Sequence, residues 1–349
     1  MNGDVVRKKL AYIEQLFLAD LVNLDSSIDN IKFADFKIKK YTSEELADLF
    51  QVEKEAHEGG HFIVIKKDYQ IKEEPEKKKT FLIPPLDLSL EDPKIFYKPI
   101  LILNLFKENE DPVIFWRCYS RRYDAQKGKI EKHITNSIIN FEELLECNYN
   151  GDIILRKRCK LLPDEIPQLK RFSKAILPFI SKKEYKKDEI FLQIALTFFE
   201  DGIRKELNPD INEMRLIDFM IALESLFLQK ESEIAYKFSN RVAMLVSSND
   251  SEKQEVRRYA KKLYNLRSDI VHGASTKGEI SRNLSRLECG QGTGFKCTVR
   301  EILRRSILYF SSIFDNGYKK GKILEMLDDA IFDKKVEEKI NRSKKKFMF

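Results

Sequence analysis

The sequence predicts an α+β protein with a mixed α/β domain at residues 1–160, a helical domain at 161–333 and a basic C-terminal tail at 334–349. Two observations predict this division. Short β-branched and aromatic runs, separated by Pro, Asp and Gly, dominate the first part and favour a mostly antiparallel sheet. Beyond residues 161–163, long segments repeat apolar residues at helical spacing. The length of 349 residues is enough for two hydrophobic cores.

In the N-terminal domain, residues 5–23 carry apolar residues near helical spacing and predict a first helix. A second helix is expected to begin at Thr42 or Ser43, because Glu44 and Glu45 follow in its first turn. Residues 71–79 are expected to form a charged connector. The predicted strands are 61–70, 79–83, 98–106, 113–119 and 152–159.

The C-terminal domain is expected to be all helical, with a loop at 274–297 that contains four glycines. The segment 214–228 is apolar nearly all round and is therefore predicted to be the buried central helix. The predicted helices are 163–181, 187–206, 212–229, 232–247, 251–273, 298–315 and 319–332.

Composition indicates a globular protein of the cytoplasm with no membrane partner. No run approaches 18 apolar residues, and charged residues interrupt the first 24 positions, where a signal peptide needs an apolar stretch. The five cysteines are scattered and include no Cys-x-x-Cys pair, so free thiols are expected. Of the net charge of +7, residues 334–349 supply +5. This tail is expected to be a solvated end, so the charge alone is weak evidence for nucleic acid binding.

Residues 57–61 spell His-Glu-Gly-Gly-His, which satisfies the zinc metallopeptidase pattern. That chemistry needs His57, Glu58 and His61 on one intact helix. Two central glycines cost about 1 kcal/mol each in a helix interior, and a strand-like run follows at once. We therefore expect a helix to end at Gly59 and Gly60, and no metal or other cofactor is predicted.

Within the helix predicted at 251–273, residues 253–273 present one apolar face, and Arg267 lies inside it. A guanidinium in such a face must pair with an acid or reach an opening, because burying it alone is very costly. Glu224, in the predicted central helix, is the first candidate to pair with Arg267 or with Arg241. On these residues alone, structure by itself can account for all three, and a core ion pair is the favoured role of Arg267.

His272 projects away from the apolar face, about 140° around the helix from Arg267. Gly273 follows it and predicts the end of the helix. Ser268 and Asp269 are four and three residues earlier, close enough on the helix to hydrogen-bond the imidazole ring. On structural grounds alone, His272 is interpreted as a residue that caps the end of the helix.

The stretches IALESLFL, KFSNRVAMLV and LYNLRSDIVHGAS, within residues 213–275, resemble the ApeA-like branch of the HEPN superfamily in order and spacing. Members of that superfamily are compact helical domains that carry Arg, four to six residues, then His. Arg267 and His272 occupy those places here. Ser268 stands where active members commonly have Asn, Asp or His, and Asp269 follows one position later.

The resemblance implies a metal-independent endoribonuclease, with His272 as general acid or base, Arg267 as phosphate clamp and Ser268, Asp269, Glu224 and Arg241 in support. It also implies an RNA partner and a homodimer formed through the helical domain, in a defence or toxin-like effector. The N-terminal domain would then sense a trigger or bind a regulatory partner. The alternative is a non-catalytic HEPN module that binds RNA, nucleotide or a protein partner.

Overall fold

The computed structural model describes residues 12–22, 24–27, 29–50, 60–70, 94–107, 114–124, 129–136, 145–147, 153–155, 159–182, 184–205, 212–288 and 298–347. The chain divides into two compact units. Unit 1 comprises Met1–Leu103 and Asn109–Pro167, and unit 2 comprises Asn104–Glu108 and Gln168–Phe349. The boundary predicted near residue 160 lies shortly before this division. None of the described helices is both long and apolar enough to cross a membrane.

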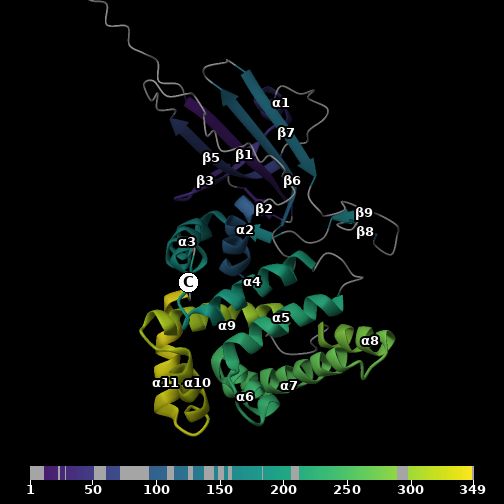
Figure 1. The fold of residues 1–349 in the computed structure, drawn as a ribbon, viewed down its shortest axis with the longest axis vertical. Coiled ribbons are helices and arrows are strands. Elements are labelled where there is room, and N and C mark those ends of the chain that lie inside the picture. The colour runs from purple at the N-terminus through teal and green to yellow at the C-terminus, as the bar shows by residue number, and fades with distance from the viewer. Residues whose placement is uncertain are drawn as a thin grey trace, which may run out of the picture. The chain divides into compact units, whose positions relative to one another are not determined.

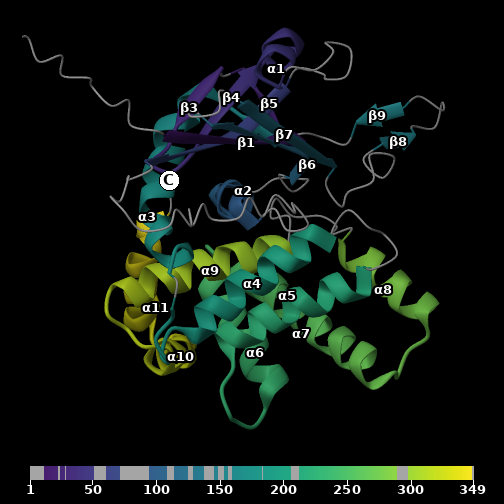
Figure 2. The ribbon, with the colours of Figure 1, turned by 45° about the horizontal axis from the view of Figure 1, so that its top comes forward.

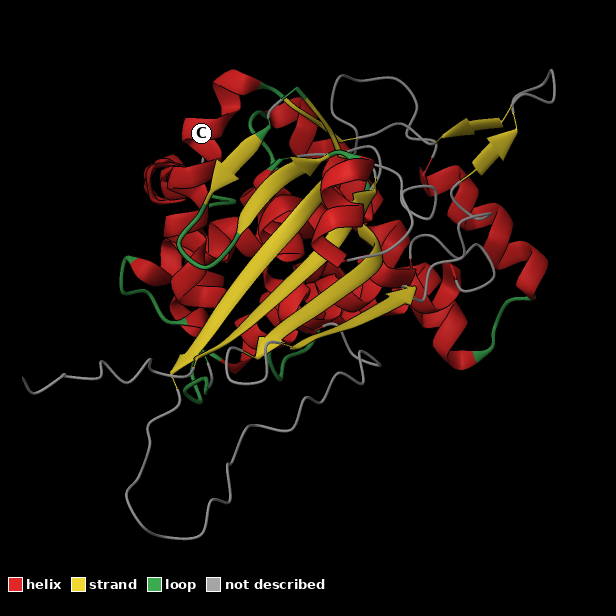
Figure 3. Ribbon diagram, turned by 90° about the horizontal axis from the view of Figure 1, so that it is seen from above, coloured by secondary structure: helices red, strands yellow, loops and turns green. Residues whose placement is uncertain are grey.

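Unit 1 is built around a six-stranded sheet in which every neighbouring pair is antiparallel, as Figure 3 shows. The strand order is β3-β4-β5-β1-β6-β7. This sheet confirms the α+β class and its antiparallel character. The sheet strands are β1 (Tyr12–Val22), β3 (Asn30–Lys32), β4 (Lys37–Tyr41), β5 (Gly60–Gln70), β6 (Ile114–Asp124) and β7 (Lys129–Asn136).

The other four strands of unit 1 are short, with three residues each. β2 (Leu24–Ser26) pairs in parallel with β10 (Cys159–Leu161), and β8 (Leu145–Cys147) pairs with β9 (Ile153–Leu155). The strand predicted at 152–159 thus corresponds to β9 and the first residue of β10. The predictions for 71–79 and 79–83 lie outside the described residues.

Helix α1 (Ser43–Phe50) begins where the sequence predicts. The backbone N–H of Thr42 donates to Glu45 Oε2 at 2.9 Å, and the N–H of Glu45 donates to Thr42 Oγ1 at 3.1 Å. This reciprocal capping box satisfies two N–H groups that a helix start leaves without intrahelical partners. The expected end of this helix at Gly59 and Gly60 falls partly on residues 51–59, outside the described part.

The helix predicted for residues 5–23 is wrong where the structure describes it, because Tyr12–Val22 form strand β1. β1 pairs with β5 on one side and β6 on the other. Leu16 and Leu18 are buried on one face of the strand and Ala19 and Leu21 on the other. A strand covered on both faces reads as a nearly continuous apolar run, which mimics helical spacing.

The strand predicted at 98–106 is also wrong, because this segment belongs to helix α2 (Lys94–Phe106). The run of Ile and Leu favoured a strand, yet short apolar runs are ambiguous between the two structures. Phe96, Ile100 and Leu103 recur at helical spacing and are all buried. The helical period therefore decides the structure, and Pro99 is accommodated within the helix.

Unit 2 is a set of helices in which α5 is central, as predicted (Figures 1 and 2). α5 packs against α4, α7 and α9, and Phe219, Met220 and Leu223 are among its buried residues. The helices are α3 (Ile166–Ile180), α4 (Ile190–Lys205), α5 (Asn212–Phe227), α6 (Ile234–Val246), α7 (Asp250–His272), α8 (Lys277–Glu288), α9 (Val299–Asp315), α10 (Lys320–Asp329) and α11 (Lys334–Ser343). All seven predicted helices of the domain are present.

The loop predicted at 274–297 is wrong over its first half, which contains α8. Thr276 Oγ1 and the N–H of Thr276 both donate to Glu279 Oε2 at 2.9 Å, which caps the start of this helix. Ile280 and Leu287 are buried on its inner side. The Thr-x-x-Glu pattern was the sequence signal for this helix.

The basic tail is folded over its described residues, 334–347, so the prediction of a solvated end is wrong there. Residues Lys334–Ser343 form α11, and a 3-10 turn follows at Lys344–Phe347. Ile340 and Phe347 are buried, and the Phe347 ring lies 6.1 Å from the ring centroids of both Phe172 and Phe179. Four of its cations, Lys334, Lys335, Lys339 and Arg342, are exposed on the amphipathic helix α11, whereas Lys344 is buried.

Candidate functional site

Helix α7 carries both residues of the Arg-x4-His pattern. Its apolar side buries Val256, Leu263 and Leu266 against the rest of unit 2. Arg267 lies on this side, and its Nε is 3.1 Å from Glu224 Oε1 of α5. Of the two partners predicted for Glu224, the structure therefore shows Arg267. The side chains of both residues remain partly accessible, at 25% for Arg267 and 22% for Glu224.

The contact between Arg267 and Glu224 is incomplete. Arg267 Nη2 donates to Glu224 Oε2 at 3.3 Å, but Arg267 Nε and Glu224 Oε1 make no aligned hydrogen bond and have no other partner in the described structure. Burial raises the pKa of Glu224, and the charge of Arg267 opposes that rise. Such an arginine keeps donor capacity that an anion from outside can use.

His272 is the last residue of α7 and is exposed. Gly273 follows with φ of 63°, and its N–H donates to the carbonyls of Asp269 and Ile270. This left-handed residue ends the helix as predicted, because glycine adopts positive φ without a steric cost. In the described structure no hydrogen bond joins His272 to Ser268 or Asp269, which both lie partly exposed on the same helix.

Arg267 and His272 do not meet within one chain. Their positions on α7 are separated by about 140° around the axis and about 7.5 Å along it. Accordingly Arg267 faces α5, whereas His272 faces solvent. A site that uses both side chains on one phosphate needs a contribution from outside this helix.

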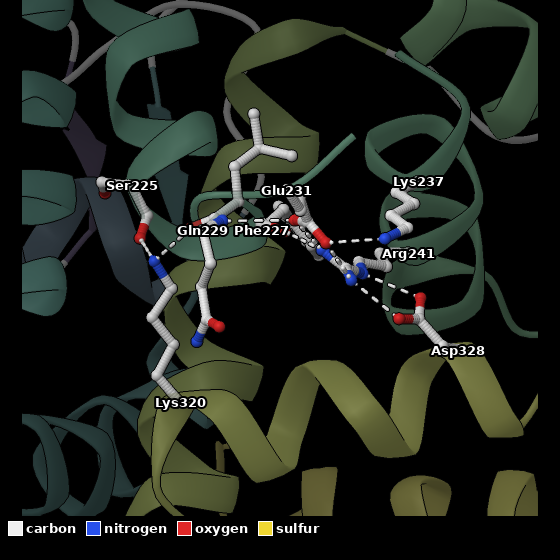
Figure 4. Close-up of polar contacts among 9 residues, drawn as sticks. Ser225, Phe227, Gln229, Glu231, Lys237, Arg241, Lys320 and Asp328 are labelled. Atoms are coloured by element: carbon white, nitrogen blue, oxygen red, sulfur yellow. Dashed lines mark hydrogen bonds and ion pairs between the residues drawn. The ribbon is translucent and has the colours of Figure 1, made fainter. Parts of the chain in front are cut away.

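Arg241 of α6 belongs to a separate and fully bonded network, shown in Figure 4. Its Nε and Nη2 donate to the two carboxylate oxygens of Asp328, at 2.8 and 2.7 Å. Its Nη1 and Nη2 donate to Glu231 at 2.6 and 2.9 Å, and Nη1 also reaches the carbonyl of Phe227 at 2.8 Å. All five N–H groups are used and only 4% of the side chain is exposed. Arg241 is therefore a structural residue that ties α6 to α10 and to the end of α5.

Lys320, at the start of α10, caps the C-terminal end of α5 (Figure 4). Its Nζ donates to the carbonyls of Ser225 and Leu228 at 2.7 and 2.5 Å, which are among those that a helix end leaves without partners. Burial lowers the pKa of Lys320 to about 8, with Glu231 raising it and Arg241 lowering it further. The ammonium favours the negative end of the helix dipole.

Replacing Lys320 by Met is expected to destabilise unit 2 by about 1–3 kcal/mol, because two partly buried carbonyls lose their donor while the aliphatic stem is kept. Urea unfolding followed by circular dichroism at 222 nm measures this. The matched control is Lys322→Met, whose side chain is 52% exposed and, among the described residues, forms its ion pair with Glu325. The control should leave the urea midpoint nearly unchanged, because its side chain is exposed. Equal losses in both variants would contradict the capping role.

Of the three side chains that the zinc-like pattern needs, His57, Glu58 and His61, only His61 lies in the described residues. It belongs to strand β5 and pairs with Lys40 of β4, so its imidazole is not on a helix. His57 and Glu58 lie outside the described part. Among the residues described, no group of three or more metal-binding side chains is present.

Sequence patterns did not point to Glu231, Asp328 or Lys320, because their partners are distant in the chain. Asp328 lies 87 positions from Arg241. The only available signal was the acid-rich stretch before α6, where Glu231 and Glu233 follow the apolar end of α5.

No protein-family model, curated protein or solved structure matches this chain.

Proposed function

We propose that unit 2 is an HEPN-like domain of the ApeA-like kind, and that the protein is a metal-independent endoribonuclease acting as a homodimer. The three stretches that carry the resemblance lie in α5, α6 and α7, which pack against one another. A defence or toxin-like role, with unit 1 as sensor or regulator, belongs to the same proposal.

The observation that carries this proposal is the difference in hydrogen bonding between Arg241 and Arg267. Arg241 uses all five of its N–H groups within the protein, whereas Arg267 makes one long hydrogen bond and leaves its Nε unbonded. Buried polar groups are normally satisfied, so the exception calls for an explanation. The side chain of Arg267 is 25% exposed, so a phosphate can accept from the part of the guanidinium that faces solvent, while the buried Nε stays against Glu224.

The chemistry follows from the two side chains. A neutral His272 takes the proton of a ribose 2′-hydroxyl, and the 2′-oxygen then bonds to the adjacent phosphorus. The bond from phosphorus to the 5′-oxygen breaks, and that oxygen takes a proton from a protonated histidine. The guanidinium of Arg267 stabilises the charge on the non-bridging phosphate oxygens. The products are a 2′,3′-cyclic phosphate and a 5′-hydroxyl.

A second copy of the chain completes the proposed site. One chain offers a single His272, although separate acid and base roles need two imidazoles. The angular separation of Arg267 and His272 on α7 also favours an arrangement in which side chains from two copies meet. Sedimentation of the purified protein should therefore show a dimer.

The alternative function is a non-catalytic HEPN module that binds RNA, nucleotide or a protein partner. The ion pair between Arg267 and Glu224 supports it, because a guanidinium that holds α7 against α5 has a structural role whether or not RNA is cut. Ser268, in place of the residue common in active members, points the same way.

The test is incubation of structured and single-stranded RNA with the purified protein in EDTA. We expect cleavage that leaves 2′,3′-cyclic phosphate ends, and no cleavage of the matching DNA, which lacks the attacking hydroxyl. An RNA with a single 2′-deoxy nucleotide at the cut position should resist cleavage there. Cleavage that EDTA abolishes, or equal cleavage of DNA, would contradict the proposed chemistry.

A further inference from the structure

The solvent side of α7 carries four exposed cations, Arg257, Arg258, Lys261 and Lys262. At 100° per residue they occupy an arc of about 140°, and His272 falls within the same arc. We call these four residues the basic face of α7. The axial distance from Arg257 to His272 is about 22 Å, at 1.5 Å per residue.

The charges of this basic face are not neutralised by neighbouring acids. In the described part of the chain, none of the four cations makes an ion pair. Arg258 Nε donates only to the carbonyl of Gln254, at 3.3 Å. By contrast Lys253, at the start of the same helix, pairs with Asp250 and Glu337. Asp269 lies in the same arc near His272, so the attraction for an external polyanion comes from the four unpaired cations in the middle of the helix.

An exposed aromatic ring lies at the far end of the basic face from His272. Tyr236 of α6 is 52% exposed, and the guanidinium of Arg257 lies 5.6 Å from its ring centroid. A tyrosine of this kind offers a flat surface on which a base can stack. Aromatic rings beside a row of cations are typical of proteins that bind single-stranded nucleic acids.

We propose that the basic face of α7 binds the phosphate backbone of single-stranded RNA and leads it to His272, with one base stacked on Tyr236. This inference rests on the proposed function, since it names the path of the substrate to that site. An acidic protein segment would pair with the four cations, but its carboxylates would not stack on the ring of Tyr236. RNA satisfies both, and it places a phosphate chain along the helix that ends at His272.

The experiment measures RNA binding by fluorescence anisotropy, with a labelled single-stranded oligonucleotide and His272→Ala as the parent protein, so that no RNA is cut. Changing the four cations to Gln (R257Q, R258Q, K261Q, K262Q) should raise Kd at least about tenfold, because up to four phosphate contacts are lost. The slope of log K against log salt should become shallower by about 3, at about 0.7 per contact for single strands. Tyr236→Ala should raise Kd about fivefold or more.

The matched control removes four other exposed cations of unit 2 (K170Q, K174Q, K334Q, K335Q) and makes the same change in net charge. Its Kd should stay within about twofold of the parent value, because these residues lie on α3 and α11. Circular dichroism of both variants checks that the helices are intact. Equal Kd values for the parent and the variant of the basic face would overturn the proposal, as would a parent that binds no RNA. If polyglutamate binds the parent protein as tightly as RNA does, the RNA proposal is wrong and the basic face instead binds an acidic protein.

The failure of this inference and that of the proposed function give different results. If the protein cuts RNA but the variant of the basic face binds and cuts as well as the unmodified protein, the basic face is not the path and the nuclease proposal stands. If RNA binds through the basic face but is never cut, the nuclease proposal fails and the binding surface stands.

Discussion

Replacing His272 by Ala is expected to lower the rate of RNA cleavage by about 10²–10⁴-fold, the usual contribution of a general acid or base. The fold should not change, since His272 is exposed and lies at the last position of α7, before the glycine that ends the helix. RNA binding should also persist, because the proposed phosphate contacts lie elsewhere on the helix. Single-turnover cleavage and anisotropy measure the two quantities separately.

The matched control for this change is Val271→Ala, at a neighbouring position whose side chain is 51% exposed. It should retain cleavage within about twofold. Equal cleavage by the wild type and His272→Ala would show that His272 has no catalytic role. Arg267→Ala is a poorer test of catalysis, because it also leaves the partly buried Glu224 without its only ionic partner among the described residues.

Replacing Arg241 by Ala is expected to destabilise unit 2 by about 3–5 kcal/mol, the usual result of removing one partner from a buried ion pair. Glu231 and Asp328 would each lose a two-pronged contact, and the carbonyl of Phe227 would lose its donor. Arg241→Lys should recover only part of the loss, since one ammonium cannot reproduce the forked geometry. Urea unfolding followed at 222 nm measures both variants.

The comparison variant for Arg241 is Arg267→Ala, which removes one long hydrogen bond rather than a network. Its loss of stability should be clearly smaller. If the two losses are equal, Arg267 is as structural as Arg241, and the non-catalytic alternative gains its strongest support. This comparison therefore separates the two candidate functions without any RNA present.

The same network makes the stability of unit 2 depend on pH in the acid range. Burial raises the pKa of Glu231, but hydrogen bonds from Arg241 and Lys237 outweigh it and lower that pKa to about 2. The folded pKa is thus below the ordinary value of 4.5, so the contribution of Glu231 to stability is present above pH 4.5 and is lost as the pH falls toward 2. In the unfolding experiment, Arg241→Ala should remove much of this acid dependence.

The sequence by itself determined the features that depend on neighbouring residues. It predicted seven helices of unit 2, though neither α8 nor α11, together with the start of α1 at its capping box and the end of α7 at Gly273. It also placed Arg267 in an apolar face and His272 outside it, because both positions follow from the helical period alone. These features need no knowledge of the rest of the chain.

Only the tertiary structure decided the features that depend on distant partners. The segment at β1 is a strand because β5 and β6 flank it, and the last residues are folded because Phe172 and Phe179 receive Phe347. Glu224 had two possible arginines, and the packing of α5 on α7 selected Arg267. Strand pairing and burial depend on residues far apart in the chain, so the spacing of neighbouring residues does not predict these contacts.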